Sequence, residues 1–216
     1  MIKLWFIPKN VSCDLLSKEE ITWADGLSEL RSHEYKHSRS HLRRVLANLF
    51  KMYYLDIPLF APPSKSPELT NDDLGYVSIS HSRNSLLLGW ANSPIGIDIE
   101  HSDRKISLNG ISSRFFTDYE KMILNKIDKN DKNSSPSSAL KLWVSKEAAI
   151  KWQRGKLFKD IINWECNYET RKLINIKSNL EVNFKSFIFQ RHHIAVASNC
   201  IKDDTTLLIC SEKGKY

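Results

Sequence analysis

The segment Pro94-Ile95-Gly96-Ile97-Asp98-Ile99-Glu100 (PIGIDIE) predicts a β-strand that carries two acids. Side chains alternate between the two faces of a strand, so Asp98 and Glu100 share one face while Ile97 and Ile99 share the other. Two carboxylates about 7 Å apart along a strand can converge on one hard cation. The alternative is a strand that ends at the surface with two solvated acids, and for this motif alone we favour that alternative.

On both sides of this strand the sequence predicts helices and further strands in an α+β arrangement. Strands are expected at 4–7, 76–80, 86–91, 95–100, 182–189, 193–197 and 207–209. Helices are expected after a capping box at Ser17 and Glu20, and over about 28–54, 108–125 and 140–152. The three strands from 76 to 100 are separated by turn residues and predict an antiparallel meander.

Two polar or proline-rich segments predict loops. Residues 61–67 contain three prolines, which remove backbone donors and hold the chain extended. Residues 126–138 are polar and lack aromatic side chains, which predicts a mobile surface loop. Because both halves of the chain follow a helix-then-sheet order, we expect two similarly built subdomains, 1–101 and 102–216.

The composition is that of a globular protein with an anionic partner. The chain has 216 residues, of which 41% are hydrophobic, and 32 basic against 25 acidic residues give a net charge of +7. This charge fits nucleic acid, phosphate-bearing cofactors, acidic proteins and anionic membranes equally well. No apolar run approaches the roughly 18 residues of a membrane span, and the apolar N-terminal stretch is too short for a secretory signal, so we expect a cytoplasmic protein. Four scattered cysteines without a CxxC pair indicate neither a zinc site nor a redox motif.

A second acidic motif follows in Trp143-Val144-Ser145-Lys146-Glu147-Ala148-Ala149-Ile150-Lys151. On a helix Glu147 and Lys151 are four residues apart and share a face. Taken alone, this is best explained as an ordinary stabilising ion pair. Together with the acidic strand, Glu147 becomes the third carboxylate of a magnesium site, and Lys151 is placed to meet a phosphate that shares the metal.

Further candidates for phosphate binding lie in the first hundred residues. The strand that ends in Ser80, His81 and Ser82 places a histidine between hydroxyl groups. Basic side chains suited to phosphate occur at Arg39, Arg43, Arg44 and Lys65. The alternatives are a hydrogen-bonded structural histidine and a solvated basic helix face.

Taken in order, these motifs resemble the Sfp-type 4′-phosphopantetheinyl transferase family over about residues 31–200. The resemblance rests on the paired acidic motifs, which match the family's signature. It is strengthened by pieces in the family's order: the arginine-bearing helix, Ser80-His81-Ser82, Arg114-Phe115-Phe116 and the strand at 193–197. Either acidic motif alone is a weak signal, whereas the ordered set is specific.

The resemblance implies an α+β fold of two pseudo-symmetric subdomains in one chain, with coenzyme A between them. It implies a holo-[acyl-carrier-protein] synthase that moves the 4′-phosphopantetheine arm of coenzyme A onto a serine of an apo carrier protein and releases 3′,5′-ADP. The expected partners are acidic acyl or peptidyl carrier domains, with no nucleic acid, no membrane and a monomeric enzyme. The pathway served is one that makes fatty acids, peptides, polyketides or siderophores.

The resemblance also assigns roles to residues. Asp98, Glu100 and Glu147 are expected to hold Mg²⁺, and Glu147, directly or through a bound water, to accept the serine proton. Coenzyme A contacts are expected from Arg39, Arg43, Arg44, Lys65, Ser80, His81, Asp98, Lys146 and Lys151. Phe115 and Phe116 are placed where the family docks its carrier protein, although core packing is the more common role for a single phenylalanine.

Two other function classes remain open from the sequence. The three acids, Lys151 and the positive charge would also suit a magnesium-dependent nucleic-acid phosphodiesterase. A non-catalytic module that recognises carrier proteins or nucleotides is the third hypothesis, and the complete set of acids argues against it.

Overall fold

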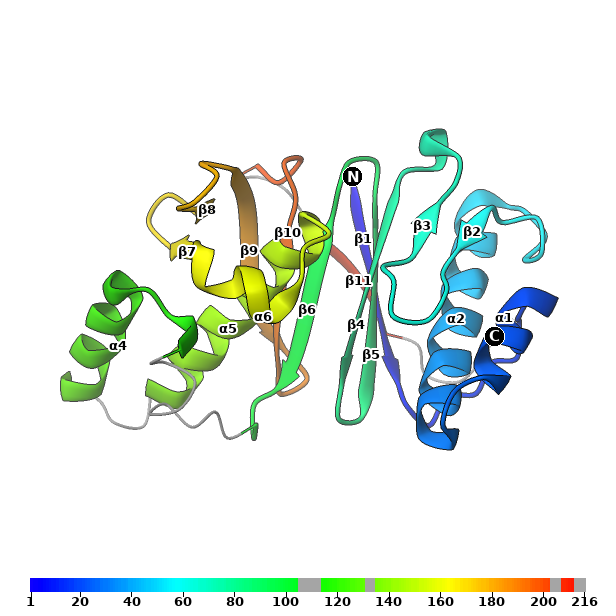
Figure 1. The fold of residues 1–216 in the computed structure, drawn as a ribbon, viewed down its shortest axis with the longest axis horizontal. Helices are drawn as coiled ribbons and strands as arrows, with labels where there is room; N and C mark the ends of the chain where they lie inside the picture. The colour runs from blue at the N-terminus through cyan, green and yellow to red at the C-terminus, as the bar shows by residue number, and fades with distance from the viewer. Residues whose placement is uncertain (105–113, 131–134, 203–206, 212–216) are drawn as a thin grey trace. The chain divides into compact units, whose positions relative to one another are not determined.

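A computed structural model describes residues 1–104, 114–130, 135–202 and 207–211, and gives side-chain environments for these except 128–130, 135, 136 and 207–211. The chain forms two compact units. The first comprises Met1–Ile79, Asn84–Asn92 and strand β11 (Leu207–Ser211). The second comprises Ser80–Arg83 and the described part of Ser93–Thr205. The order of the elements can be followed in Figure 1.

The first unit is built on a four-stranded sheet of order β11-β1-β5-β4. Its strands are β1 (Ile2–Pro8), β5 (Ser85–Ala91), β11 and β4 (Tyr76–Ser82), whose last residues count with the second unit. β1 runs antiparallel to β5, with Ile2 opposite Ala91, and parallel to β11, with Ile2 opposite Leu207. The remaining elements are α1 (Lys18–Asp25), α2 (Glu29–Phe50), the short pair β2 (Leu59–Phe60) and β3 (Glu68–Leu69), and a 3₁₀ turn η1 (Asp72–Leu74).

The core of the first unit lies between α2 and the sheet. Leu42, Val45 and Leu46 recur at helical spacing on α2 and pack in one cluster with Ile7 and Leu88 of the strands. The predicted capping box of α1 is confirmed: the Glu20 amide donates to Ser17 Oγ at 3.2 Å, and the Ser17 amide donates to Glu20 Oε2 at 2.9 Å.

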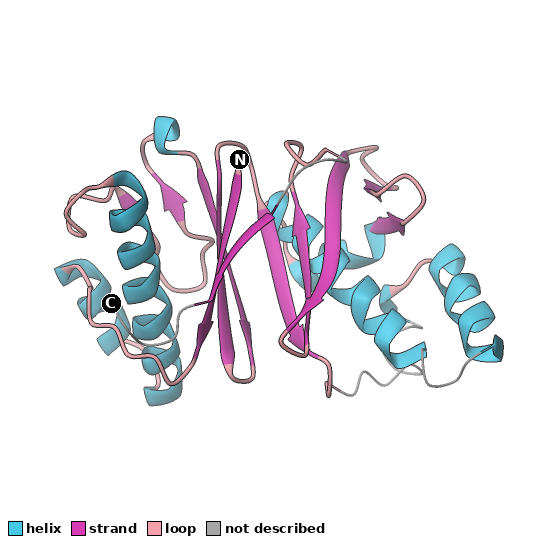
Figure 2. Cartoon of the chain, turned by 180° about the vertical axis from the view of Figure 1, so that it is seen from behind, coloured by secondary structure: helices cyan, strands magenta, loops and turns pink. Residues whose placement is uncertain are grey.

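The second unit is built on a five-stranded antiparallel sheet of order β6-β10-β9-β8-β7. Its strands are β6 (Gly96–His101), β7 (Trp164–Asn167), β8 (Lys172–Asn175), β9 (Glu181–Phe189) and β10 (His192–Ala197). Its helices are α4 (Asp118–Asn130), α5 (Ser135–Trp152), α6 (Leu157–Asp160) and the 3₁₀ turn η2 (Ile161–Asn163). Figure 2 shows these helices and strands by type.

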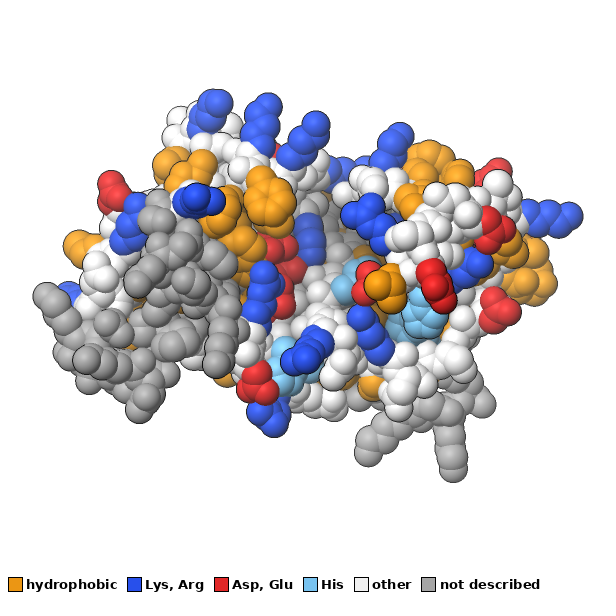
Figure 3. All heavy atoms as spheres, turned by 60° about the horizontal axis from the view of Figure 1, so that its bottom comes forward, with side chains coloured by type: hydrophobic (Ala, Val, Ile, Leu, Met, Phe, Trp, Pro, Cys, Tyr) orange, Lys and Arg blue, Asp and Glu red, His pale blue; other side chains and the backbone are white. Residues whose placement is uncertain are grey.

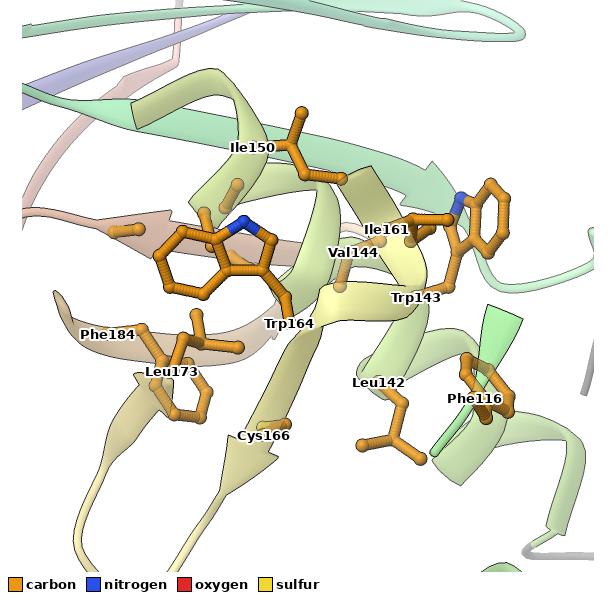
Figure 4. Packing of buried hydrophobic residues seen from close by; sticks show 14 of the residues in the cluster. Phe116, Leu142, Trp143, Val144, Ile150, Ile161, Trp164, Cys166, Leu173 and Phe184 are labelled. Atoms are coloured by element: carbon orange, nitrogen blue, oxygen red, sulfur yellow. The ribbon is translucent and has the colours of Figure 1, made fainter. Parts of the chain in front are cut away.

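Helix α5 forms the centre of the second core. Its Val144 and Ile150 belong to one buried cluster with Trp164, Leu173 and Phe184 from the strands, as Figure 4 shows. α5 also packs against β6, the strand that carries the first two acids.

Gly96 allows this close packing of β6 on α5. A Cβ atom at Gly96 would collide with the backbone oxygen of Ala148 and the backbone nitrogen of Trp152. Because these are backbone atoms of a helix, no side-chain rotation could make room. Glycine at this position therefore sets how near the acids of β6 come to α5.

The structure confirms the predicted α+β class. Strands lie where the sequence predicts them at 76–80, 86–91, 95–100, 182–189 and 193–197. Three other predictions from the sequence are not matched in the same way. Residues 126–130 and 135–138, expected as loop, are helical in α4 and α5. The three strands from 76 to 100 do not form one meander, because β4 and β5 belong to one sheet and β6 to another. The start of the expected 108–125 helix, residues 108–113, lies outside the described residues.

The compact units do not divide at residue 101. β6 belongs to the second unit, and β11, near the end of the sequence, belongs to the sheet of the first. None of the helices within the described ranges combines the length and apolar character that crossing a lipid bilayer requires.

Candidate functional site

Strand β6 and helix α5 bring three carboxylates together in the second unit. Asp98 and Glu100 lie on one face of β6, and Glu147 lies on α5. One ligand oxygen from each residue lies within 4.8 Å of the others. The convergence that the sequence motifs predict is therefore present in the geometry.

Asp98 is held by a serine and a lysine. Its Oδ1 accepts a hydrogen bond from Ser80 Oγ at 2.6 Å and from Lys151 Nζ at 2.7 Å. Lys151 Nζ also donates to Ser80 Oγ at 2.9 Å, so the three side chains form a closed triangle. The Asp98 side chain is only 3% exposed, and its Oδ2 is buried without a hydrogen-bond partner among the residues that the structure describes.

Glu100 is paired with an arginine next to the site. Arg104 Nη1 forms an ion pair with Glu100 Oε1, four residues away, and its guanidinium lies 5.6 Å from the ring centroid of Trp143 on α5. Arg104 thus partly neutralises Glu100 while it rests on the indole face. The sequence analysis did not identify Arg104, because no periodicity pairs the end of a strand with a residue in the turn that follows it.

Glu147 lies in surroundings that favour its protonated form. Burial, followed by the nearby Asp98 carboxylate, raises the pKa of Glu147 to about 8, although Lys151 and Arg104 act in the opposite direction. Carboxylates crowded together in a buried place favour protonation unless a cation joins them.

The residues present fit a magnesium ion. Mg²⁺ prefers carboxylate oxygens and typically takes only a few of them from the protein. Three converging carboxylates supply these oxygens, and the buried, unpartnered Asp98 Oδ2 is a polar atom that a cation would satisfy.

Three of the predicted basic residues, Arg39, Arg43 and Arg44, are buried in the first unit. Arg43 Nε donates to Glu20 Oε2 at 2.6 Å, and its Nη1 donates to the carbonyls of Tyr54 at 2.9 Å and Ile57 at 3.3 Å. Arg39 Nε donates to the Ala61 carbonyl at 3.1 Å. These guanidinium groups hold α1 and residues 54–61 to α2. This buried structural role differs from the solvated helix face that the sequence analysis gave as the alternative.

Arg44 is oriented by a histidine that the sequence analysis did not consider. Arg44 Nη2 donates to His41 Nδ1 at 2.7 Å, and His41 Nε2 donates to the Val11 carbonyl at 2.9 Å. Because a guanidinium only donates and a carbonyl only accepts, His41 must be neutral, with its proton on Nε2. Burial, together with Arg44, lowers the pKa of His41 to about 4, which keeps this arrangement at neutral pH.

Lys65 and His81 are exposed, the first in the first unit and the second in the second unit. The Lys65 ammonium lies 5.8 Å from the ring centroid of Phe60. Ser80, by contrast, is buried and bonded directly to Asp98.

Lys146 does not fit the coenzyme contact that the resemblance implied. Its side chain is fully buried, and Nζ donates to Glu120 Oε2 at 2.6 Å and to the Phe115 carbonyl at 2.7 Å. Glu120 also accepts from the amides of Thr117 at 2.9 Å and Cys166 at 3.0 Å. The pair therefore joins the start of α4, strand β7 and helix α5, and the Thr117–Glu120 spacing was a capping-box signal that the sequence analysis missed.

The two phenylalanines have different environments. Phe116 is completely buried in the second core, which agrees with the core-packing alternative. Phe115 is partly buried and packs edge to face on Trp143, with ring centroids 5.7 Å apart. Only Phe115 retains surface with which a partner could make contact.

Comparison with known proteins matches this geometry to a family. The family model described as the 4′-phosphopantetheinyl transferase superfamily matches residues 94–205, which include all three carboxylates. The chain belongs to the 4′-phosphopantetheinyl transferase superfamily. A relative, 4′-phosphopantetheinyl transferase ffp from Bacillus subtilis, is 32% identical over 115 residues. The aligned region covers 53% of this chain and 49% of the relative, so the chain matches about half the length of that transferase.

Proposed function

We propose that the chain transfers the 4′-phosphopantetheine group of coenzyme A to a serine hydroxyl of an apo carrier protein. In this reaction the serine oxygen forms a bond to the phosphorus next to the pantetheine arm. The bond from that phosphorus to the bridging oxygen of the pyrophosphate breaks, and 3′,5′-ADP leaves with the bond electrons. The observation that carries the proposal is the convergence of Asp98, Glu100 and Glu147 within a matched phosphopantetheinyl transferase region.

We assign Asp98, Glu100 and Glu147 to a magnesium ion. When bound, such an ion neutralises pyrophosphate charge and stabilises the charge that develops on the leaving group. The support is the oxygen donor set and the unpartnered Asp98 Oδ2.

Lys151 is assigned to the pyrophosphate. Its side chain is 30% exposed, whereas the Asp98 side chain with which it pairs is 3% exposed, so the ammonium lies at the edge of the site. From there it can donate to a phosphate oxygen while Ser80 and Asp98 hold its position. Phosphoryl transfer depends mainly on such positioning and charge neutralisation.

Glu147 is assigned as the group that takes the serine proton. The support is its position, because its carboxylate lies in the acidic cluster, where a serine hydroxyl aligned with the pyrophosphate would come within its reach. The proton moves from the serine hydroxyl to a Glu147 carboxylate oxygen, directly or through a water.

The phosphate at the other end of coenzyme A is assigned to basic residues of the first unit. Arg43 uses its donors on Glu20 and two carbonyls, so we give it the role of fixing α2. Arg44, oriented by His41, is the stronger candidate for the 3′-phosphate, and Lys65 is an exposed cationic group of the same unit.

Intact-mass measurement of carrier proteins tests this function. The protein is incubated with coenzyme A, MgCl₂ and apo carriers from fatty-acid, peptide and polyketide synthesis. We expect at least one carrier to gain the mass of one phosphopantetheine, EDTA to abolish the gain and excess Mg²⁺ to restore it. No gain on any carrier contradicts the proposal. Mg²⁺-dependent cleavage of DNA or RNA in a parallel gel assay would instead support a phosphodiesterase.

A further inference from the structure

The second unit exposes an aromatic side chain on a very short helix. Phe158 lies on α6 and is 79% exposed. Its ring centroid is 6.2 Å from that of Phe115, which in turn packs on Trp143. These three residues, here called the aromatic cluster, form a continuous apolar path from the surface to helix α5. Figure 3 shows hydrophobic side chains gathered beside acidic and basic ones on one face.

Positive charge surrounds the exposed end of the aromatic cluster. Lys156 and Lys159 flank Phe158 and are exposed. Neither ammonium group has an ion-pair or hydrogen-bond partner among the described residues. The acid of this segment, Asp160, is engaged with the backbone, because its Oδ2 accepts from the Lys156 amide at 2.7 Å. An apolar ring with two cations beside it favours a partner that presents an apolar side chain among acids.

The inner end of the aromatic cluster adjoins the acidic site. Trp143 and Glu147 are four residues apart and share a face of α5. Arg104 joins Trp143 to Glu100, since it rests on the indole and pairs with the carboxylate. Two ring contacts, Phe158–Phe115 and Phe115–Trp143, therefore separate a macromolecule bound at Phe158 from the residues next to the carboxylates.

We infer that Phe158, with Lys156 and Lys159, is a docking surface for the acidic carrier protein. This inference rests on the proposed function and adds residues of α6 to it. The carrier's acidic helix lies on the two lysines, and one of its apolar side chains packs on the Phe158 ring. The partner is thereby identified as a protein with an acidic, partly apolar surface, and its serine is brought near Glu147.

Steady-state transfer to an apo acyl carrier protein tests the docking surface. Phe158→Ala and Lys159→Glu are compared with Ile176→Ala and Lys177→Glu, which alter an exposed hydrophobic residue and an exposed lysine on another part of the second unit. We expect each α6 substitution to raise the KM for the carrier about tenfold or more, because exposed aromatic anchors dominate such interfaces. The KM for coenzyme A is expected to stay at the wild-type value in the α6 variants. Both control variants are expected to keep the wild-type KM for the carrier. Circular dichroism spectra verify that each variant is folded.

The salt dependence of carrier use distinguishes the contribution of the Phe158 ring from that of the lysines. Raising NaCl from about 50 to 300 mM weakens carrier use by the wild type and by Phe158→Ala, and weakens it less in Lys159→Glu. If the wild type transfers and the α6 variants keep its carrier KM, the docking surface is wrong while the proposed function stands. If the wild type transfers to no carrier, the proposed function is wrong and the inference fails with it.

Discussion

At the scale of single residues, Glu147 is the side chain that we assign both to the metal ion and to proton transfer. Replacing Glu147 by Gln keeps the shape and removes both the charge and the basic oxygen. We expect transfer to fall by more than about 100-fold, while the circular dichroism spectrum is unchanged. Mn²⁺ binding followed by electron paramagnetic resonance, with Mn²⁺ as a probe for Mg²⁺, is expected to weaken as well.

Glu169→Gln is the matched control, because Glu169 is an exposed acid in a turn of the same unit. It is expected to retain wild-type transfer and Mn²⁺ affinity. Wild-type turnover by Glu147→Gln would show that Glu147 is neither a metal ligand nor the base.

The low pKa of His41 leads us to expect that the first unit loses stability in acid. Its pKa is about 4 in the folded protein because of burial, below the ordinary value of 6.5 for a histidine. The unfolded state therefore binds more protons between these pH values, and the stabilisation present above pH 6.5 is lost as the pH falls toward 4. After allowance for solvent screening, the loss is about 2 kcal/mol. Urea unfolding at pH 7.5 and 4.5 measures it.

His41→Gln is expected to reduce this pH dependence, because glutamine can donate and accept hydrogen bonds without titrating. His33→Gln, at an exposed position of the same helix, is the control. An unchanged difference between the two pH values in His41→Gln would refute the role given to His41.

The convergence of the acids could be predicted from the sequence, whereas the partners of the cations could not. Asp98, Glu100 and Glu147 lie in motifs whose period fixes the face they share, so their convergence follows once β6 packs on α5. Lys146 lies in the same motif, but its partner Glu120 is 26 positions away. Only tertiary structure shows that the lysine points into the core. The partner of Arg43 could not be predicted for the same reason, since Glu20 lies on another helix.

At the scale of elements, the contact between β6 and α5 determines the geometry of the site. Gly96→Ala places a methyl group against the α5 backbone, so the helix must move away from the strand. We expect a loss of about 3 kcal/mol in unfolding free energy and weakened Mn²⁺ binding, because Glu147 moves with α5. Chemical denaturation and a Mn²⁺ titration measure the two effects.

Gly26→Ala provides the comparison at a glycine with space. A Cβ there would meet the Trp23 carbonyl oxygen at 3.6 Å, an ordinary contact, and φ is −79°. We expect Gly26→Ala to change the unfolding free energy by less than about 1 kcal/mol. Equal effects of the two substitutions would mean that the close approach at Gly96 is not what fixes α5.

The errors at element scale have a common physical cause. Composition alone made 126–138 a loop, yet Leu124 is buried and Ile127 follows three residues later, so the apolar face of α4 continues into this segment. Pro136 lies in the first turn of α5, where an α-helix needs no amide hydrogen bond. Strands β7 and β8 have four residues each, too short for a period to be recognised.

At the scale of the whole molecule, the order of residues along the chain does not follow the division into units. The first unit takes its strand β11 from near the end of the sequence, and residues 80–82 of β4 count with the second unit. A helix-then-sheet order in each half predicts two subdomains of consecutive residues. This order could not indicate that β11 joins the sheet of the first unit. The pairing of β11 with β1 is long-range and parallel, and no local signal marks such a contact.

Because β11 belongs to the sheet of the first unit, we expect the stability of this unit to depend on β11. Between its neighbours β5 and β11, β1 is an inner strand, and deletion of residues 203–216 would turn it into an edge strand. We expect the β1 amides that bond toward β11 to exchange with deuterium about tenfold faster or more, because local opening then breaks fewer contacts. The amides of β9 and β10, in the second unit, serve as the internal reference and keep their exchange rates. Deletion of residues 212–216 alone leaves β11 in place and should not change exchange in β1. Unchanged β1 exchange in the longer deletion would mean that β11 contributes nothing to the sheet and that the first unit is complete without it.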